Sequence, residues 1–120
     1  MRDRYTLLEM VHGYCDYTVD DMVDVAMDRI IELDHDMEPS EVADVAESVG
    51  KALMLIDQET DGLDEWEVIA SDLYDAIDHD DCSSMLAKRC ALMCGAYGVS
   101  ILYDLMQGVL VDAMDLGLYN

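Results

Sequence analysis

The chain has no phenylalanine and very few positively charged side chains, with six Lys and Arg against 28 Asp and Glu. Without Phe, a core must be built from aliphatic residues, ten Met, seven Tyr and one Trp, and so many Met indicate an adaptable core or contact surface. The net charge of −22 argues against direct binding to nucleic acid or to an anionic membrane, because both need Lys and Arg. A basic protein is the natural complement.

The shortage of positive charge is concentrated in one region. Between Asp16 and Asp81 there are 23 acidic residues against two cations, Arg29 and Lys51, whereas residues 82–120 are nearly neutral and apolar. A field this one-sided destabilises a fold through self-repulsion, so a partner or the environment must offset it. We therefore expect function to depend on the charge field rather than on a catalytic pocket.

Size and composition predict one folded domain. A chain of 120 residues is long enough for a single core, and about half of its residues are apolar, unlike a disordered acidic tail. Residues 1–10 contain no apolar segment long enough for a signal peptide. We therefore expect a cytoplasmic protein whose four Cys are reduced thiols.

Apolar residues recur with a helical period along almost the whole chain. The sequence predicts an all-α, compact single domain over residues 1–120, with five or six helices. The first predicted helix covers residues 3–13, the second opens with a Thr18–Asp21 capping box, and the third has Pro39 in its first turn. The fourth begins after Asp61-Gly62, and the fifth begins at Met85, capped by Ser83 or Ser84. Gly95 and Gly98 are expected to break the fifth helix, which leaves a sixth from Val99 to about Asp115. The predicted inward-facing residues are Leu7, Leu8, Val11, Val19, Met22, Val23, Ala26, Ile30, Leu33, Val42, Val45, Val49, Leu53, Ile56, Leu63, Trp66, Ile69, Leu73 and Ile77.

Three consecutive predicted helices carry acidic rows opposite their apolar faces. In the first row acids recur every fourth residue, about 6 Å apart along the axis at roughly 1.5 Å rise per residue. The rows comprise Asp20, Asp24, Asp28 and Glu32; Glu41, Asp44 and Glu47; and Asp64, Glu67, Asp75 and Asp78. Like charges at this spacing destabilise a helix by a few tenths of a kcal/mol per pair, and no Lys or Arg is interleaved as on ordinary helix surfaces. We expect the rows to form one continuous, outward-facing acidic sheet.

This spacing is comparable to duplex DNA, which presents one charge per roughly 3.4 Å on each strand. In its charge pattern alone, the region Asp16–Asp81, about half the chain, resembles the phage-encoded acidic nucleic-acid mimics of the anti-restriction and anti-CRISPR type. The resemblance implies an inhibitor that occupies the basic groove of a DNA- or RNA-binding protein, with no catalytic residue and no cofactor. It implies that the eleven acidic residues meet Lys and Arg of the target, with Tyr17, Trp66 and Tyr74 adding contacts if exposed.

Two other interpretations of the acidity stay open. The rows are also what a solvated acidic face would show. Adaptation to high salt fits the scarcity of Lys, of which the chain has only Lys51 and Lys88. Salt adaptation should place acidic residues over the whole exposed surface, and the acid-poor residues 82–120 fit that expectation less well.

The segment Asp57–Glu67 resembles an EF-hand calcium loop. Asp57, Glu59 and Asp61 match the acidic positions one, three and five, and Gly62 matches position six. The twelfth position, which should be Glu, is Val68. The alternative function is therefore a calcium-binding or acidic helical scaffold protein, against the simpler reading of an acidic turn with a Gly hinge.

Two further patterns have metal-ligand spacing. His79, Cys82, Cys90 and Cys94 could supply four zinc ligands, but the last two lie among apolar residues, where reduced Cys packs as a small hydrophobe. The pairs Glu9/His12 and Glu32/His35 match the i,i+3 spacing of di-iron bundles, whose ligands point inward. Glu32 lies on the outward acidic row, so we expect no metal site.

The stretch Cys90–Val111 is apolar enough to raise the question of a membrane anchor. Asp104 near its centre would cost about 3 kcal/mol on insertion. We expect a mostly buried helix that forms the bundle centre or an interface between copies of the chain. The sequence also has no Gly-rich phosphate loop, nucleophile elbow or spaced Ser/His/Asp set, so we expect no enzyme.

Overall fold

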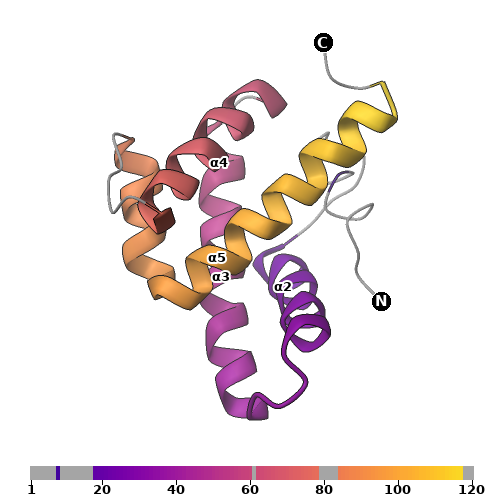
Figure 1. Cartoon of the computed structure of the whole chain (residues 1–120), viewed down its shortest axis with the longest axis vertical. Coiled ribbons are helices and arrows are strands. Elements are labelled where there is room, and N and C mark those ends of the chain that lie inside the picture. Colours follow the sequence, from indigo (N-terminus) through magenta and orange to yellow (C-terminus); the bar gives the residue numbers. More distant parts are fainter. Residues whose placement is uncertain (1–7, 9–17, 61, 79–83, 118–120) are drawn as a thin grey trace.

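The computed structural model describes residue 8 and residues 18–60, 62–78 and 84–117. Within these residues the chain is all-helical, with four helices: α2 (Val19–Leu33), α3 (Pro39–Glu59), α4 (Leu63–Asp78) and α5 (Met85–Asp115) (Figure 1). The all-α prediction is confirmed, but five or six helices are more than the four found. The predicted helix over residues 3–13 lies outside the described residues except for Leu8, which is helical and buried.

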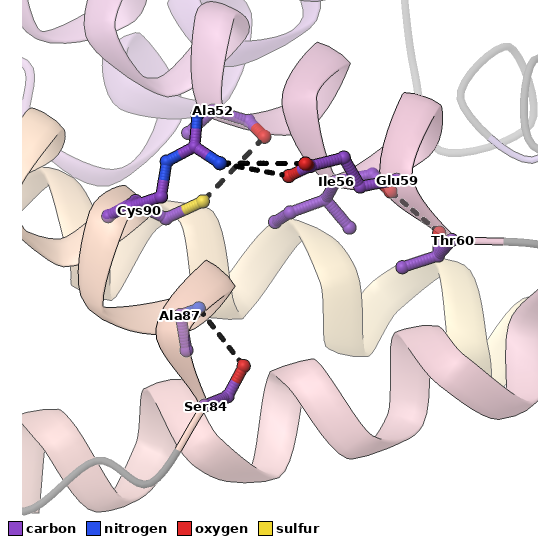
Figure 2. Close-up of polar contacts among 8 residues, drawn as sticks. Ala52, Ile56, Glu59, Thr60, Ser84, Ala87 and Cys90 are labelled. Atoms are coloured by element: carbon purple, nitrogen blue, oxygen red, sulfur yellow. Dashed lines mark hydrogen bonds and ion pairs between the residues drawn. The ribbon is translucent and has the colours of Figure 1, made fainter.

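Local sequence signals set the starts of three helices, as predicted. The Thr18 hydroxyl accepts a hydrogen bond from the Asp21 N–H at 3.4 Å, and the Asp21 carboxylate accepts one from the Thr18 N–H at 2.9 Å. This capping box satisfies two backbone donors that the first turn leaves unpaired. Pro39 is the first residue of α3, and the Ser84 hydroxyl accepts a hydrogen bond from the Ala87 N–H at the start of α5 (Figure 2).

The most apolar helix, α5, occupies the centre of the fold. It packs against α3 and α4 and, to a lesser extent, against α2, while α2 and α3 pack closely on each other as a hairpin. In Figure 1 the C-terminal part of α5 crosses between α4 on one side and α2 on the other. The largest fully buried side chains include Trp66, Met22, Leu53, Leu102 and Met106, so every described helix contributes to one core.

Most predicted inward residues of α2, α3 and α4 are buried or partly buried, which confirms the helical period. The prediction that Leu33 and Ile77 face inward is wrong, because both side chains are exposed. Each lies in the last turn of its helix.

Two glycines of α5 behave differently. Gly95, with φ 72° and ψ 177°, leaves the helical conformation, and α5 bends there (Figure 1). A residue with a Cβ adopts this backbone region at a cost of about 1–3 kcal/mol. Gly98 stays helical and is buried against Val45 and Val49 of α3. The predicted interruption of the last helix is therefore present at Gly95 and absent at Gly98.

By length and composition, α5 is the one helix among the described residues that could cross a membrane. Half of its most apolar 18-residue window is buried inside the fold. The Gly95 bend also divides it into two shorter segments. Core helices pass the same test of length and composition, so this is weak evidence for a membrane span.

Candidate acidic interaction surface

The eleven predicted contact residues lie on α2, α3 and α4 and point their carboxylates outward. Nine are exposed, and Asp28 and Asp75 are half-buried. Their helices are amphipathic, so burial of the apolar face on the core leaves the acidic face in solvent. The prediction of outward-facing acidic rows is confirmed for each helix.

The three rows do not form one continuous sheet, which corrects the expectation from the sequence. The rows of α2 and α3 lie on a packed hairpin, whereas α4 packs on α5 and has no comparable contact with α2 or α3 in the described residues. The physical reason is that α4 buries its apolar face on α5, whereas α2 buries its apolar face chiefly on α3. We call the first group, Asp20, Asp24, Asp28, Glu32, Glu41, Asp44 and Glu47, the hairpin acids, and the second, Asp64, Glu67, Asp75 and Asp78, the α4 acids.

Three of the four described Lys and Arg residues are already paired within the molecule. Arg29 bonds to Asp104 of α5 at 2.5 Å and to Glu32 at 3.0 Å. Lys51 bonds to Glu47 at 2.8 Å. The ion pairs therefore engage two of the hairpin acids.

The third pair joins Arg89 of α5 to Glu59 at the end of α3, at 3.3 Å. Among the described Lys and Arg, Lys88 alone has no ion pair. Most of the eleven acids have no ion pair with a described cation; these are Asp20, Asp24, Asp28, Glu41, Asp44, Asp64, Asp75 and Asp78.

Two pKa shifts follow from these pairs. The hydrogen bond from Lys51 lowers the pKa of Glu47, and the hydrogen bond to Asp104 raises the pKa of Arg29. The Arg29–Asp104 pair also explains the acidic residue within the apolar α5. Because Asp104 lies at the surface beside a cation, it anchors α2 to α5.

One of the three predicted aromatic contact residues, Tyr74, lies at the surface. Tyr74 of α4 is 44% exposed and stacks obliquely with Tyr103 of α5, with ring centroids 5.6 Å apart and an interplanar angle of 44°. Trp66 is buried in the core, so it does not meet the condition of exposure under which a contact was expected. Tyr17 lies outside the described residues.

The segment that resembles a calcium loop is mostly helical. Asp57 and Glu59 belong to the last turns of α3, Glu67 lies within α4, and Asp61 is outside the described residues. Only residues 60–62 separate the two helices, fewer than an EF-hand loop requires. Partial burial raises the pKa of Asp57. The geometry therefore favours the interpretation as an acidic turn.

Cys90 and Cys94 pack against α3. The Cys90 thiol donates to the Ala52 carbonyl oxygen at 4.0 Å (Figure 2), and the Cys94 thiol donates to the Ser48 carbonyl oxygen at 3.6 Å. Burial raises the pKa of Cys94 to about 12, the opposite of what a thiolate ligand needs. The other two residues of the zinc pattern, His79 and Cys82, lie outside the described residues.

No group of three or more His, Cys, Asp or Glu side chains in the described part of the chain is arranged to hold a metal ion. Of the di-iron patterns, Glu9 and His12 lie outside that part. Glu32 bonds to Arg29, and His35 is exposed beyond the end of α2.

An apolar surface lies at the bend of α5, away from the acidic rows in sequence. Leu92 is 87% exposed, and Met93 and Tyr97 are also exposed. Lys88 lies one turn before Leu92 on the same helix. This surface belongs to the acid-poor region that the sequence delimits.

Comparisons with known proteins add no family. No protein-family model matches the chain, and no curated protein and no solved structure shows significant similarity to it.

Proposed function

We propose that this protein is an acidic mimic of DNA or RNA that binds the basic nucleic-acid groove of a target protein and competitively inhibits it. The observation that carries the proposal is the outward display of carboxylates on α2, α3 and α4, most of them without a cationic partner in the described chain. Internal pairs use up three of the four described cations, so the excess negative charge is directed to solvent. A phage inhibitor of a bacterial defence nuclease, acting in the cytoplasm and without catalysis, would have this character.

The electrostatics give the mimic its mechanism. Carboxylates about 6 Å apart along a helix present Lys and Arg of a groove with a row of charges of the kind that a phosphate backbone presents. Complementary fields speed association and weaken steeply as salt screens them. A protein that binds phosphates would therefore accept this surface in place of its nucleic acid.

Division of the acids into two groups bears on how the target is contacted. The helices α2 and α4, which each carry one acidic row, lie on opposite sides of the C-terminal part of α5 (Figure 1). A groove that engages both must span that helix. If the groove of the target contacts only one group of acids, the other group contributes only through long-range electrostatic attraction.

Capture from a bacterial lysate tests the proposal. The immobilised protein should retain a nucleic-acid-binding protein that elutes in a salt step and is displaced by competitor DNA or RNA. Asp24→Asn with Asp44→Asn neutralises the hairpin acids, and Asp64→Asn with Asp75→Asn neutralises the α4 acids. At least one pair should weaken binding to the captured protein by about fivefold or more, because close charge pairs at such interfaces are worth more than 1 kcal/mol.

Asp36→Asn with Asp115→Asn is the matched control, since both residues are exposed, neither belongs to the eleven, and the net charge changes equally. An equal loss in the control would show that overall charge, not this surface, is responsible. Capture only of proteins that are indifferent to salt and to nucleic acid would refute the mimic.

A further inference from the structure

A groove between α4 and α5 differs in chemistry from the acidic rows beside it. It is lined by Glu67, Ser71 and Tyr74 of α4 and by Tyr103 and Gln107 of α5, and its volume is about 250 Å³. Pockets for small-molecule ligands occupy roughly 300–1,000 Å³. This groove is therefore suited to a single side chain rather than to a metabolite.

The two tyrosines form an aromatic wall with carboxylates beside it. Their ring centroids are 5.6 Å apart and their planes are inclined by 44°. A hydrogen bond to the Asp78 carboxylate holds the Tyr74 hydroxyl and raises the pKa of Tyr74. Glu67, Ser71, Tyr74 and Asp78 are spaced three or four residues apart, so they share one face of α4.

A neighbouring groove along α5 shows how this molecule accommodates a guanidinium. A second groove, lined by Arg29, Asp104 and Gln107 among others, has a volume of about 230 Å³. Arg29 supplies its own guanidinium there, bonded to Asp104 and Glu32. Gln107 lines both grooves, but the residues that line the tyrosine groove include no Lys or Arg.

We infer that the Tyr74–Tyr103 groove binds an arginine side chain of the basic partner. This inference rests on the proposed function and names a contact within it. A planar guanidinium stacks on an aromatic face and forks onto a carboxylate, whereas an ammonium is more strongly hydrated and does neither as well. The groove therefore selects arginine over lysine, which a uniform acidic surface does not do.

The test uses the whole protein and tri-arginine amide as the probe, with tri-lysine amide at the same charge and ionic strength. Tyrosine-ring NMR resonances, assigned with single Tyr→Phe variants, should shift saturably at Tyr74 and Tyr103 with tri-arginine and about threefold or more weakly with tri-lysine. Tyr97 is the control position, because it is exposed to a similar extent but lies at the bend of α5.

Variants distinguish the contribution of the Tyr74 ring to binding from that of the negative charge. Tyr74→Leu should weaken tri-arginine binding by about threefold to tenfold, Tyr74→Phe should retain the affinity within about twofold, and Tyr97→Leu should leave it unchanged. Tyr74 is well exposed, so the fold should tolerate Tyr74→Leu; if thermal unfolding shows otherwise, Glu67→Gln takes its place, with the same direction expected.

Three results would overturn the inference. These are equal affinities for the two peptides, shifts at Tyr97 as large as at Tyr74, and shifts at Tyr74 on concentrating the protein alone, which would assign the groove to a second copy. The proposed function fails separately, if no nucleic-acid-binding protein is captured. Arginine selectivity without such a target would leave the groove as an arginine site and reject the mimic.

Discussion

At the scale of single residues, burial rather than spacing decides what Cys90 and Cys94 do. Their thiols donate to carbonyl oxygens of α3, and the apolar surroundings raise the pKa of Cys94 to about 12. The thiolate is the reactive form of cysteine. The raised pKa keeps the Cys94 thiol protonated at neutral pH, which makes it a weak nucleophile in the native state.

We predict that Cys94 resists alkylation by iodoacetamide at pH 8 in the native protein. Its rate should be about 10³-fold below that of a free thiol with a pKa of about 8.5, and unfolding in urea should remove the protection. Peptide mass spectrometry resolves Cys94 from the other cysteines. Rapid native labelling of Cys94 would contradict the buried placement.

Asp57 gives a pH-dependent prediction. Burial raises its pKa above the usual 3.8, so the folded state binds the proton more tightly than the unfolded state does. The charged carboxylate therefore destabilises the fold at neutral pH, and the penalty fades as the pH falls through the raised pKa. Asp57→Asn should raise the free energy of unfolding at pH 7, and the gain should disappear below about pH 3.8.

Urea unfolding at several pH values measures this effect. Asp64→Asn is the control, because it removes the same charge from an exposed position. A similar gain in both variants would attribute the effect to general repulsion and not to burial. Calcium titration of Asp57→Asn separately tests the calcium-binding alternative, which requires a loss of binding.

At the scale of elements, the α2–α3 hairpin depends on a close approach of two helices. A Cβ added at Gly50 would lie 2.5 Å from the Val23 Cγ2 and 2.7 Å from the Val23 backbone N. Backbone atoms of α2 cannot move aside without shifting the whole helix. The hairpin acids are therefore held in place by this contact.

We predict that Gly50→Ala destabilises the protein by about 1–3 kcal/mol, as overpacking does, despite the better helix propensity of Ala. Gly62→Ala is the matched control, because a Cβ there meets no atom within 4 Å. It should cost less than about 1 kcal/mol, because Gly62 is the residue before α4, where Ala is less favourable than Gly. Chemical denaturation measures both, and equal stabilities would show that the two helices can separate at no cost.

At the scale of the whole molecule, charge segregation determines where contacts can form. The acidic helices repel a second copy of the chain, whereas the bend of α5 exposes Leu92, Met93 and Tyr97 in an acid-poor region. We propose that any association between copies uses this apolar surface. Screening of the acidic faces by salt should favour it.

The corresponding prediction is that the average mass from light scattering rises with protein concentration and with NaCl. Leu92→Glu should abolish the rise. Val68→Glu, a change at another exposed apolar residue (60%) on α4, should not. A mass that is constant in all three proteins would reject self-association through α5.

Local sequence patterns predicted the helices and their buried and exposed faces. Periodicity and local capping need only neighbours in the chain, so the Thr18–Asp21 box, Pro39 and Ser84 could be placed, as could most inward residues of α2, α3 and α4. The outward direction of each acidic row follows from the same amphipathic pattern.

The packing of the helices on one another could not be predicted from these local patterns. Because α4 packs on α5 and α2 packs chiefly on α3, the acids fall into two groups. Packing also buries Trp66 and brings Tyr74 of α4 against Tyr103 of α5. The Arg29–Asp104 pair joins residues 75 positions apart. Such contacts depend on how the apolar faces of all the helices pack into one core, which cannot be read from any short stretch of sequence.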